Sequence, residues 1–420
     1  MWIFFLPVGK MIAGICFWLI AGFGITEAKQ AISTTIDPGF LANVANPADV
    51  ADGISVGGHP SATNTNYYKD KYEDAKKQLE ILKEKHAKHE PPPYQIGNEY
   101  SPSYGQTVER IRERGKLLCG SYDNVPGFSD RQAGDHWEGF EIDICKAVAI
   151  AVLGEDWAME TVKVNGKTRF EKLYDGSIDI IAATTTFTFS RDVEWRIEFM
   201  PTTYYDGQGF IVRRSLGVKS AKDLTGARVC YSDAGTAAQN IKDFFELWDV
   251  DFIPVPLKAG QTPADFYIDG KCDMYGTDRS SLAGKKSTFS NPNAHVILPE
   301  VISKEPLGPA VKYGDQQFSD IARWAIYVLF LAEELGIDQI TIDDFGSHKN
   351  PIIQIFMGEK GDLGAKLGIK DSFAVDIITE VGNYKEIFEL HLGKDTRLGL
   401  DRGLNRLYNK GGLLYAPPLK

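Results

Sequence analysis

The segment TRFEKLYDGSIDIIAATTTFTFSRD, residues 168–192, contains the pattern that decides the fold. Its first nine residues predict a helix that ends at Gly176, and the apolar run SIDIIAATT that follows predicts a buried strand. A helix, a glycine turn and a buried strand are typical of one repeating unit of a parallel α/β sheet. Ligands of open α/β sheets bind beyond the carboxyl ends of the strands, where this segment becomes rich in hydroxyl groups.

Strands and helices alternate in the same way on both sides of this segment, from about residue 107 onward. The other expected strands are KLLCGSY (116–122), GARVCYSD (226–233), FIPVPL (252–257) and CDMYGTD (272–278). Helical patterns separate most of these strands, so we expect an α/β protein with a mostly parallel sheet.

Two short apolar segments, 209–213 and 308–312, resemble each other: each follows or begins with a glycine and ends in a basic residue. They bracket residues 214–307, which then form an inserted unit. Two strands that cross between two α/β units predict a two-lobed protein with a cleft between the lobes.

Length and composition limit the classes of protein. The chain has 420 residues, enough for about two to three domains of ordinary size. Its net charge of −11 argues against nucleic acid as a partner, because neutralising phosphates requires an excess of Lys and Arg. No cysteine lies in a C-x-x-C pair or at zinc spacing from histidines, so we expect no metal.

The amino terminus predicts export. Residues 11–25 form an uninterrupted apolar run after Lys10, short for a membrane span and typical of a signal peptide. We expect cleavage after Ala28; an uncleaved anchor over residues 2–25 is the alternative, although a Lys within the span is costly. Removal of the leader removes Cys16 and leaves four cysteines, an even number that suggests two disulfides in an exported protein.

The region between the leader and the α/β body is of a different kind. Residues 29–66 are poor in large apolar side chains and predict a loose linker, while residues 67–90 predict a helix that ends before three prolines. Apolar residues in this helix follow a heptad-like spacing. Two interpretations remain open: a solvated spacer helix, or a short coiled coil through which the protein associates with itself or a partner.

Hydroxyl groups and one arginine gather after the strand in the opening segment. Thr184, Thr186 and Thr188 alternate and share one side of an extended backbone, and Arg191 follows three residues later. Hydroxyls together with a guanidinium group can hold a carboxylate. The alternative is an ordinary run of edge-strand threonines beside a surface arginine.

Two further strand ends carry polar groups that could act on a ligand. Thr236 lies in DAGTA (233–237) before a predicted helix, where free N–H groups and the helix dipole favour an anion. Asp278 ends the strand CDMYGTD and could pair with an ammonium group. Each could instead simply cap a helix. Together they describe a site for a zwitterion, and no motif nominates a catalytic residue or a nucleotide cofactor.

Several strings resemble family 3 solute-binding proteins of polar amino acid ABC transporters, in particular the general L-amino-acid subfamily. They are VPGFS (125–129), WEGFEIDICKAVAIAV (137–152), TFSRD (188–192), YYDGQGFIVRRSLGVKSAKDL (204–224), PEVISKEPLGPAVKYGD (299–315), VGNYKEIF (381–388) and RGLNRLYNKGGLLYAPP (402–418). The likeness runs from about residue 107 to the end of the chain.

The resemblance implies a type II-like periplasmic binding fold, in which two α/β lobes joined by two strands close on the ligand. It assigns the ligand α-carboxylate to Arg191, helped by Thr186 and by Thr236 across the cleft. It assigns the α-ammonium group to Asp278 and the hydroxyl of Thr184. We call these five residues the clamp.

Three departures from the family pattern concern side-chain selectivity. There is no aromatic residue near Val125 to stack on a ligand, no second hydroxyl after Thr236, and Ala182-Ala183 stand where broad-specificity relatives tend to carry Arg-Asn. The extension before residue 100 has no counterpart in the usual family pattern.

Within such a fold we predict the disulfides Cys119–Cys145 and Cys230–Cys272, one inside each lobe, so that neither blocks hinge motion. The expected parts are a signal peptide (1–28), a linker with the helix 67–90 (29–106), the first part of lobe 1 (107–211), lobe 2 (212–307), and the return to lobe 1 with a carboxyl-terminal extension (308–420).

The function expected from all this is a periplasmic receptor that delivers L-amino acids to an inner-membrane ABC permease without chemistry or a cofactor. A dehydratase-like enzyme on the same fold and a ligand-sensing protein are the alternatives.

Overall fold

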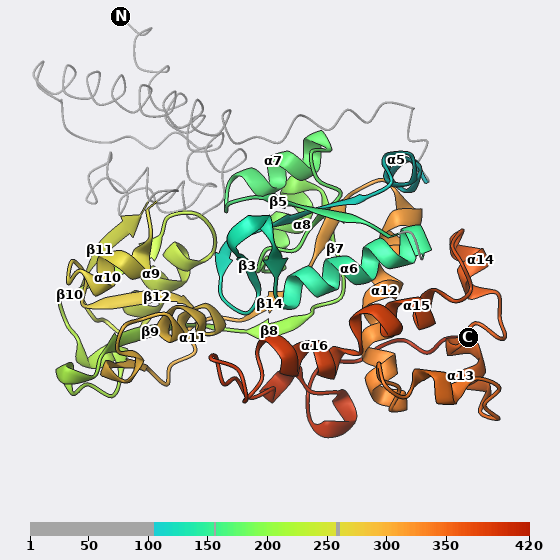
Figure 1. Cartoon of the computed structure of the whole chain (residues 1–420). Coiled ribbons are helices and arrows are strands. Elements are labelled where there is room, and N and C mark those ends of the chain that lie inside the picture. Colours follow the sequence, from blue (N-terminus) through green and yellow to red (C-terminus); the bar gives the residue numbers. More distant parts are fainter. Residues whose placement is uncertain (1–104, 155–156, 258–260) are drawn as a thin grey trace, which may run out of the picture. The chain divides into compact units, whose positions relative to one another are not determined.

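The computed structural model describes residues 105–154, 157–257 and 261–420 (Figure 1). The described residues all belong to one unit of the chain, residues 96–420. The signal peptide, the linker and the helix expected over residues 67–90 lie outside the described residues. So do the expected cleavage and self-association.

Lobe 1 is built on a five-stranded sheet with the order β5-β1-β6-β15-β7. Its strands are β1 (Leu117–Ser121), β5 (Met159–Lys163), β6 (Ile180–Ile181), β7 (Ile197–Phe199) and β15 (Ala310–Lys312). Strand β1 pairs in parallel with β5 and β6, whereas β15 runs antiparallel to both its neighbours. The helices of this part are α5 (Gln106–Arg114), α6 (Phe140–Leu153), α7 (Thr168–Asp175) and α8 (Phe189–Trp195).

Lobe 2 repeats this plan with the order β11-β10-β12-β9-β13. Its strands are β9 (Gln208–Arg213), β10 (Ala227–Ser232), β11 (Phe252–Leu257), β12 (Met274–Asp278) and β13 (His295–Ile297). Its helices are α9 (Ala237–Leu247), α10 (Pro263–Ile268) and α11 (Arg279–Ser287). Strand β10 is parallel to β11 and β12, as the alternating sequence predicted.

Two short antiparallel strands join the lobes: β8 (Tyr204–Asp206) and β14 (Glu305–Leu307). This corrects our expectation that the segments 209–213 and 308–312 are the crossing strands. The first lies in lobe 2 as part of β9, and the second lies in lobe 1 around β15. Residues 208–211 therefore belong to lobe 2. The true crossing strands have only three residues each and too little apolar pattern to be recognised.

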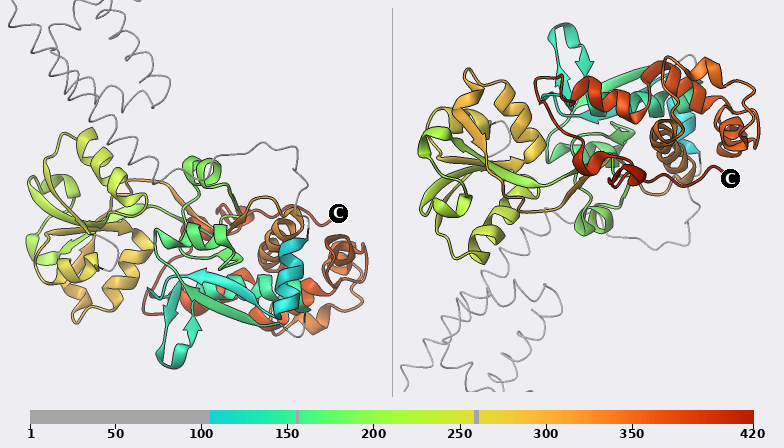
Figure 2. Two further views of the ribbon diagram at one scale, coloured as in Figure 1. Left: turned by 90° about the horizontal axis from the view of Figure 1, so that it is seen from above. Right: turned by 90° about the horizontal axis from the view of Figure 1, so that it is seen from below.

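The chain returns to lobe 1 after β14 and covers it with helices (Figure 2). They are α12 (Gln316–Leu335), α13 (Pro351–Phe356), α14 (Leu363–Leu367), α15 (Phe373–Val381) and α16 (Tyr384–His391). Helices α6, α12 and α15 pack together in the largest apolar core. Twelve of the fourteen residues of α6 are buried, and nine of them belong to this core. A small sheet of β2 (Asn124–Val125), β3 (Ser129–Arg131) and β4 (Trp137–Glu138) precedes α6.

Both predicted disulfides are confirmed. Cys119 in β1 is bonded to Cys145 in α6, and Cys230 in β10 is bonded to Cys272 just before β12. Each bridge lies inside one lobe, so neither crosses the hinge.

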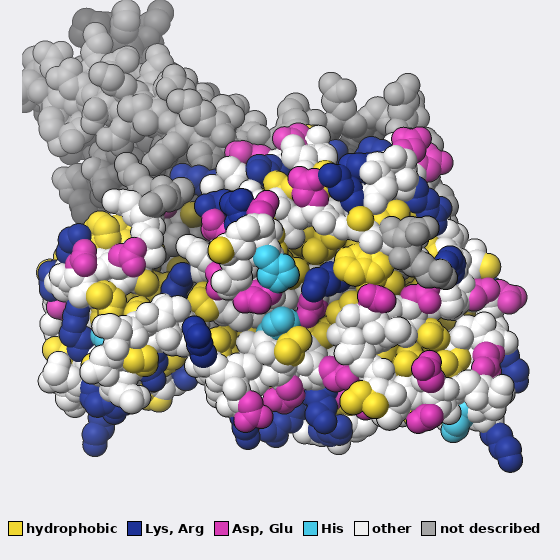
Figure 3. Space-filling view, in the orientation of Figure 1, with side chains coloured by type: hydrophobic (Ala, Val, Ile, Leu, Met, Phe, Trp, Pro, Cys, Tyr) yellow, Lys and Arg dark blue, Asp and Glu magenta, His cyan; other side chains and the backbone are white. Residues whose placement is uncertain are grey.

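The face seen in Figure 3 carries basic and acidic side chains intermixed over both lobes. Of the helices within the described ranges, none is both long and apolar enough to cross a membrane.

Candidate binding site

Arg191 is held in the first turn of α8 by the local sequence. The hydroxyl of Thr188 accepts a hydrogen bond from the Arg191 backbone N–H at 3.3 Å and so caps the helix. The Arg191 guanidinium is buried, and its Nη1 donates to the Thr186 carbonyl oxygen at 2.7 Å. Burial and the nearby Arg169 lower the Arg191 pKa to about 10, so the group remains a cation at neutral pH.

The hydroxyl run between β6 and α8 is anchored from α6. Thr184 has a backbone φ of 38°, a left-handed conformation uncommon for threonine, and its N–H donates to Glu141 Oε1 at 2.5 Å. The Glu141 carboxyl is buried, and its Oε2 has no partner among the described residues. Burial raises the Glu141 pKa to about 7. Glu141 therefore fixes the backbone of one clamp residue.

We expect Glu141→Gln to stabilise the protein at pH 8 more than at pH 5. The folded-state pKa of about 7 exceeds the ordinary value of 4.5, so unfolding releases a proton between these values and stability falls as pH rises through them. Glutamine keeps the acceptor for Thr184 and loses this pH dependence, worth roughly 2–3 kcal/mol. Thermal melting from pH 5 to pH 8, with exposed Glu171→Gln as control, measures the difference. If the difference in stability between Glu141→Gln and wild type does not change with pH, the raised pKa of Glu141 is wrong.

Lobe 2 contributes the loop before α9. Thr236 precedes α9, but its side chain makes no capping hydrogen bond; its hydroxyl instead donates to Glu305 Oε2 at 3.3 Å. Gly235, at φ 118°, faces Arg191, since a Cβ there would lie 3.6 Å from Arg191 Nη2. This loop therefore approaches the arginine across the cleft.

Asp278 ends β12 next to α11 and does not cap that helix with its side chain. Asp206 does so instead, because its Oδ2 accepts the N–H of Ser280 at 3.1 Å. Burial and the charges of Asp206 and Glu305 raise the Asp278 pKa well above its ordinary value, while Arg191 opposes the shift. An ammonium group placed beside Asp278 would offset this repulsion and favour the charged carboxylate.

The structure thus brings Arg191 and Thr186 of lobe 1 close to Thr236 and Asp278 of lobe 2, whereas for Thr184 it shows only the backbone bond to Glu141. Arg191 is close enough to Asp278 for each to shift the pKa of the other. A cation and an acid held on facing lobes complement a zwitterion.

Three charged residues of the site escaped sequence reasoning: Glu141, Arg169 and Glu305. All three are buried. Arg169 in α7 donates from Nη1 to the Ala183 carbonyl oxygen at 2.9 Å and to Thr185 Oγ1 at 3.1 Å, beneath the hydroxyl run. Glu141 and Arg169 lie in helical patterns, where a charged residue normally indicates a solvated face, and Glu305 lies on a three-residue strand. Only the tertiary contacts reveal these roles.

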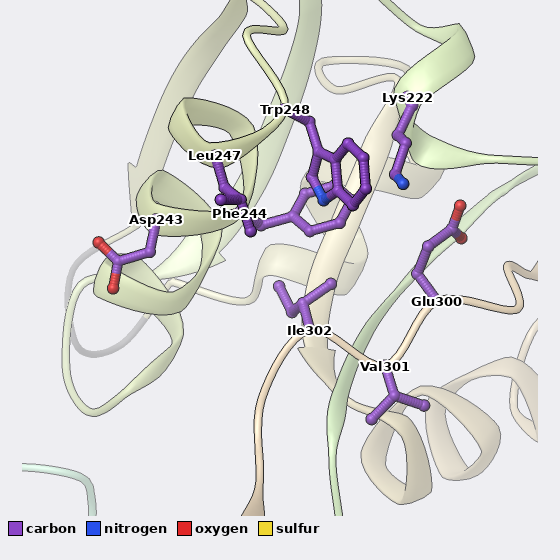
Figure 4. Close-up of a pocket in the computed structure, with 8 residues that line it drawn as sticks. All are labelled: Lys222, Asp243, Phe244, Leu247, Trp248, Glu300, Val301 and Ile302. Carbon is purple, nitrogen blue, oxygen red and sulfur yellow. The ribbon is translucent and has the colours of Figure 1, made fainter.

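A surface groove of about 330 Å³ lies on lobe 2, away from the clamp (Figure 4). Lys222 and Trp248 both line this groove, and the Lys222 ammonium group lies over the Trp248 ring, 2.9 Å from its centroid. The groove contains no clamp residue. Across the described ranges, no cluster of three or more His, Cys, Asp or Glu is arranged to hold a metal ion.

Two lobes of one α/β plan, two crossing strands and charged groups that face each other from the two lobes define the class of two-lobed ligand-binding proteins. The model of bacterial extracellular solute-binding proteins, family 3, matches residues 117–394, and the chain belongs to this family.

Curated relatives cover three quarters of the chain. The glutamate/glutamine/aspartate/asparagine-binding protein BztA of Rhodobacter capsulatus is 43% identical over 315 residues, which are 75% of this chain and 93% of the relative. The general L-amino acid-binding periplasmic protein AapJ of Rhizobium johnstonii is 42% identical over 322 residues, 76% of this chain and 94% of the relative.

A solved structure shares the fold of the described body. It is an ABC transporter periplasmic binding protein from Brucella ovis with glutathione bound, 38% identical, with a TM-score of 0.72. The match covers 74% of this chain and 98% of that protein.

Proposed function

We propose that this protein is a periplasmic receptor that binds free L-amino acids and delivers them to an inner-membrane ABC permease. The observation that carries the proposal is the placement of Arg191 and Asp278 on facing lobes of one cleft. These groups match the carboxylate and ammonium groups that all amino acids share. The printed names of the relatives BztA and AapJ support amino acids as the ligand class.

Closure of the lobes around the ligand is part of the proposal. Contacts already cross the cleft at its rim: Lys285 Nζ donates to the Asn124 carbonyl oxygen at 2.5 Å, and a Cβ added at Gly284 would lie 3.0 Å from the Pro126 carbonyl oxygen. Closure excludes water from the clamp and strengthens its charge pairs. Only the closed form then presents both lobes correctly to the permease.

The amino-terminal parts extend the same proposal. Residues 1–28 act as a cleaved signal peptide that exports the protein to the periplasm, and residues 67–90 act as a spacer or in self-association. The bacterial extracellular family to which the chain belongs supports export.

Calorimetric titration with each of the twenty amino acids tests the ligand class. We expect binding of several polar amino acids, with a free amino group and a free carboxylate both required. Amidated and acetylated forms of the bound amino acids are the matched controls. Failure to bind any free amino acid, or equal binding of the amidated and acetylated forms, would overturn the proposal.

A dehydratase-like enzyme would require a general acid in the cleft, and Asp278 with its raised pKa is a group that could donate a proton. Chromatography of the ligand after long incubation distinguishes the two functions. A receptor returns the amino acid unchanged, whereas an enzyme converts it.

A further inference from the structure

Glu305 is a buried carboxylate whose acceptor positions are taken by protein groups. It is 1% exposed and lies at the start of β14. Its Oε2 accepts from Thr186 Oγ1 at 2.5 Å and from Thr236 Oγ1 at 3.3 Å. Its Oε1 accepts from Ser303 Oγ at 2.7 Å and from Asn240 Nδ2 at 2.8 Å. A carboxylate has about four acceptor sites, so Glu305 has none left for a ligand.

These bonds set the direction of two clamp hydroxyls. A hydroxyl has a single proton, and the protons of Thr186 and Thr236 go to Glu305. Each oxygen can then only accept a further hydrogen bond. Such a group complements an ammonium donor and cannot donate to a carboxylate.

The acidic groups around the hinge also favour the ammonium end of the ligand. Glu305 lies directly opposite Asp206 in the β8–β14 pair, an unfavourable arrangement of like charges that Arg279 and Arg191 partly offset. The charges of Asp206 and Glu305 also act on Asp278 and raise its pKa. An ammonium group beside Asp278 would be attracted by the charges of Asp278, Asp206 and Glu305 and repelled by those of Arg191 and Arg169.

We propose that Glu305 is a positioning residue that turns the Thr186 and Thr236 hydroxyls into acceptors for the ligand ammonium group. The proposal rests on the proposed function and moves both threonines from the carboxylate end of the ligand to the ammonium end. The carboxylate is left to Arg191 and to the backbone N–H groups at the start of α9, an eleven-residue helix whose dipole favours an anion.

Glu305 also links the two lobes. Thr186 belongs to lobe 1, Thr236 and Asn240 belong to lobe 2, and Glu305 lies on a crossing strand between them. In this structure hydroxyls from both lobes converge on that one carboxylate. The ammonium site therefore draws on both lobes.

The test compares ligands with and without the ammonium group. The tightest ligand among L-glutamate, L-aspartate, L-glutamine and L-asparagine is titrated beside its des-amino counterpart: glutarate, succinate, glutaramate or succinamate. Glu305→Gln replaces one of the two accepting oxygens with an NH₂ group. That group cannot accept a hydrogen bond from the two threonine hydroxyls or from Ser303 and Asn240, so the network must rearrange. We expect the preference of the full-length protein for the amino acid over its des-amino counterpart to fall about tenfold or more. Affinity for the des-amino ligand should change by less than about threefold.

Two threonine variants keep the test informative if Glu305→Gln fails to fold. Thr236→Val removes one acceptor with little change of shape and should lower the same preference, whereas Thr236→Ser should retain it. Glu246→Gln, an exposed change on α9, is the matched control.

An equal loss for both ligands, or no loss for either, would overturn the role of Glu305. If the wild-type protein binds no L-amino acid at all, the proposed function fails and this inference fails with it.

Discussion

Arg191→Ala is expected to lower the affinity for every bound amino acid by about 30-fold to several thousand-fold. The ligand carboxylate loses its water when the cleft closes, and without the guanidinium it is left buried and unpaired, which costs about 2–5 kcal/mol. Arg191→Lys keeps the charge but loses the planar fork, so its affinity should fall as well. Titration of both variants with several amino acids measures the effect.

Three comparisons make this result specific. Arg110→Ala removes an exposed arginine of α5 and should leave affinity unchanged, and thermal melting checks that each variant is folded. Asp278→Asn should weaken the same set of ligands from the ammonium end, while substitutions at Val125 should reorder preferences without abolishing binding. Wild-type affinity in Arg191→Ala, or loss for only one amino acid, would place the carboxylate site elsewhere.

Loss of the lobe 2 disulfide is expected to lower the free energy of unfolding by about 2–4 kcal/mol. The bridge joins residues 42 apart in the sequence, and both cysteines are fully buried beside Leu257 in a small cluster separate from the main core of the lobe. The double variant Cys230→Ala/Cys272→Ala opens the loop without burying new hydroxyl groups. Denaturant unfolding, followed by a probe in each lobe, measures the loss.

Ligand affinity of the folded double variant should remain close to that of wild type, because neither cysteine touches the clamp. The corresponding lobe 1 variant, Cys119→Ala/Cys145→Ala, is the comparison, with a separation of 26 residues. Unchanged stability of both variants would show that the bridges do not contribute to the folded state. Loss of binding before unfolding would show that they hold the site itself.

The sequence allowed prediction of the groups that stand at strand ends. Arg191 and Thr236 each follow a strand that is visible from its apolar pattern, and Asp278 ends such a strand. Parallel strands bring their carboxyl ends to one edge of the sheet. The disulfides followed from the same assignment of strands to lobes.

Residues whose role depends on contacts across the chain could not be predicted. Glu141 lies in a helix that is apolar on all sides, and nothing in its neighbours indicates a bond to Thr184, 43 residues away. Glu305 lies on a three-residue strand and meets Thr186 over a separation of 119 residues. The crossing strands were misplaced for a related reason, since the longer apolar strands beside them dominate the pattern.

The order of strands in lobe 1 has a consequence for how the chain is assembled during synthesis. Strand β15 lies between β6 and β7, so β7 has no partner in its sheet until residues 310–312 have been added. Lobe 2, by contrast, draws its whole sheet from the continuous stretch between β9 and β13. Its contacts are shorter in sequence and cost less chain entropy to form. The first lobe to begin is therefore the last that can be completed, and the hinge pair between β8 and β14 can form shortly before that step.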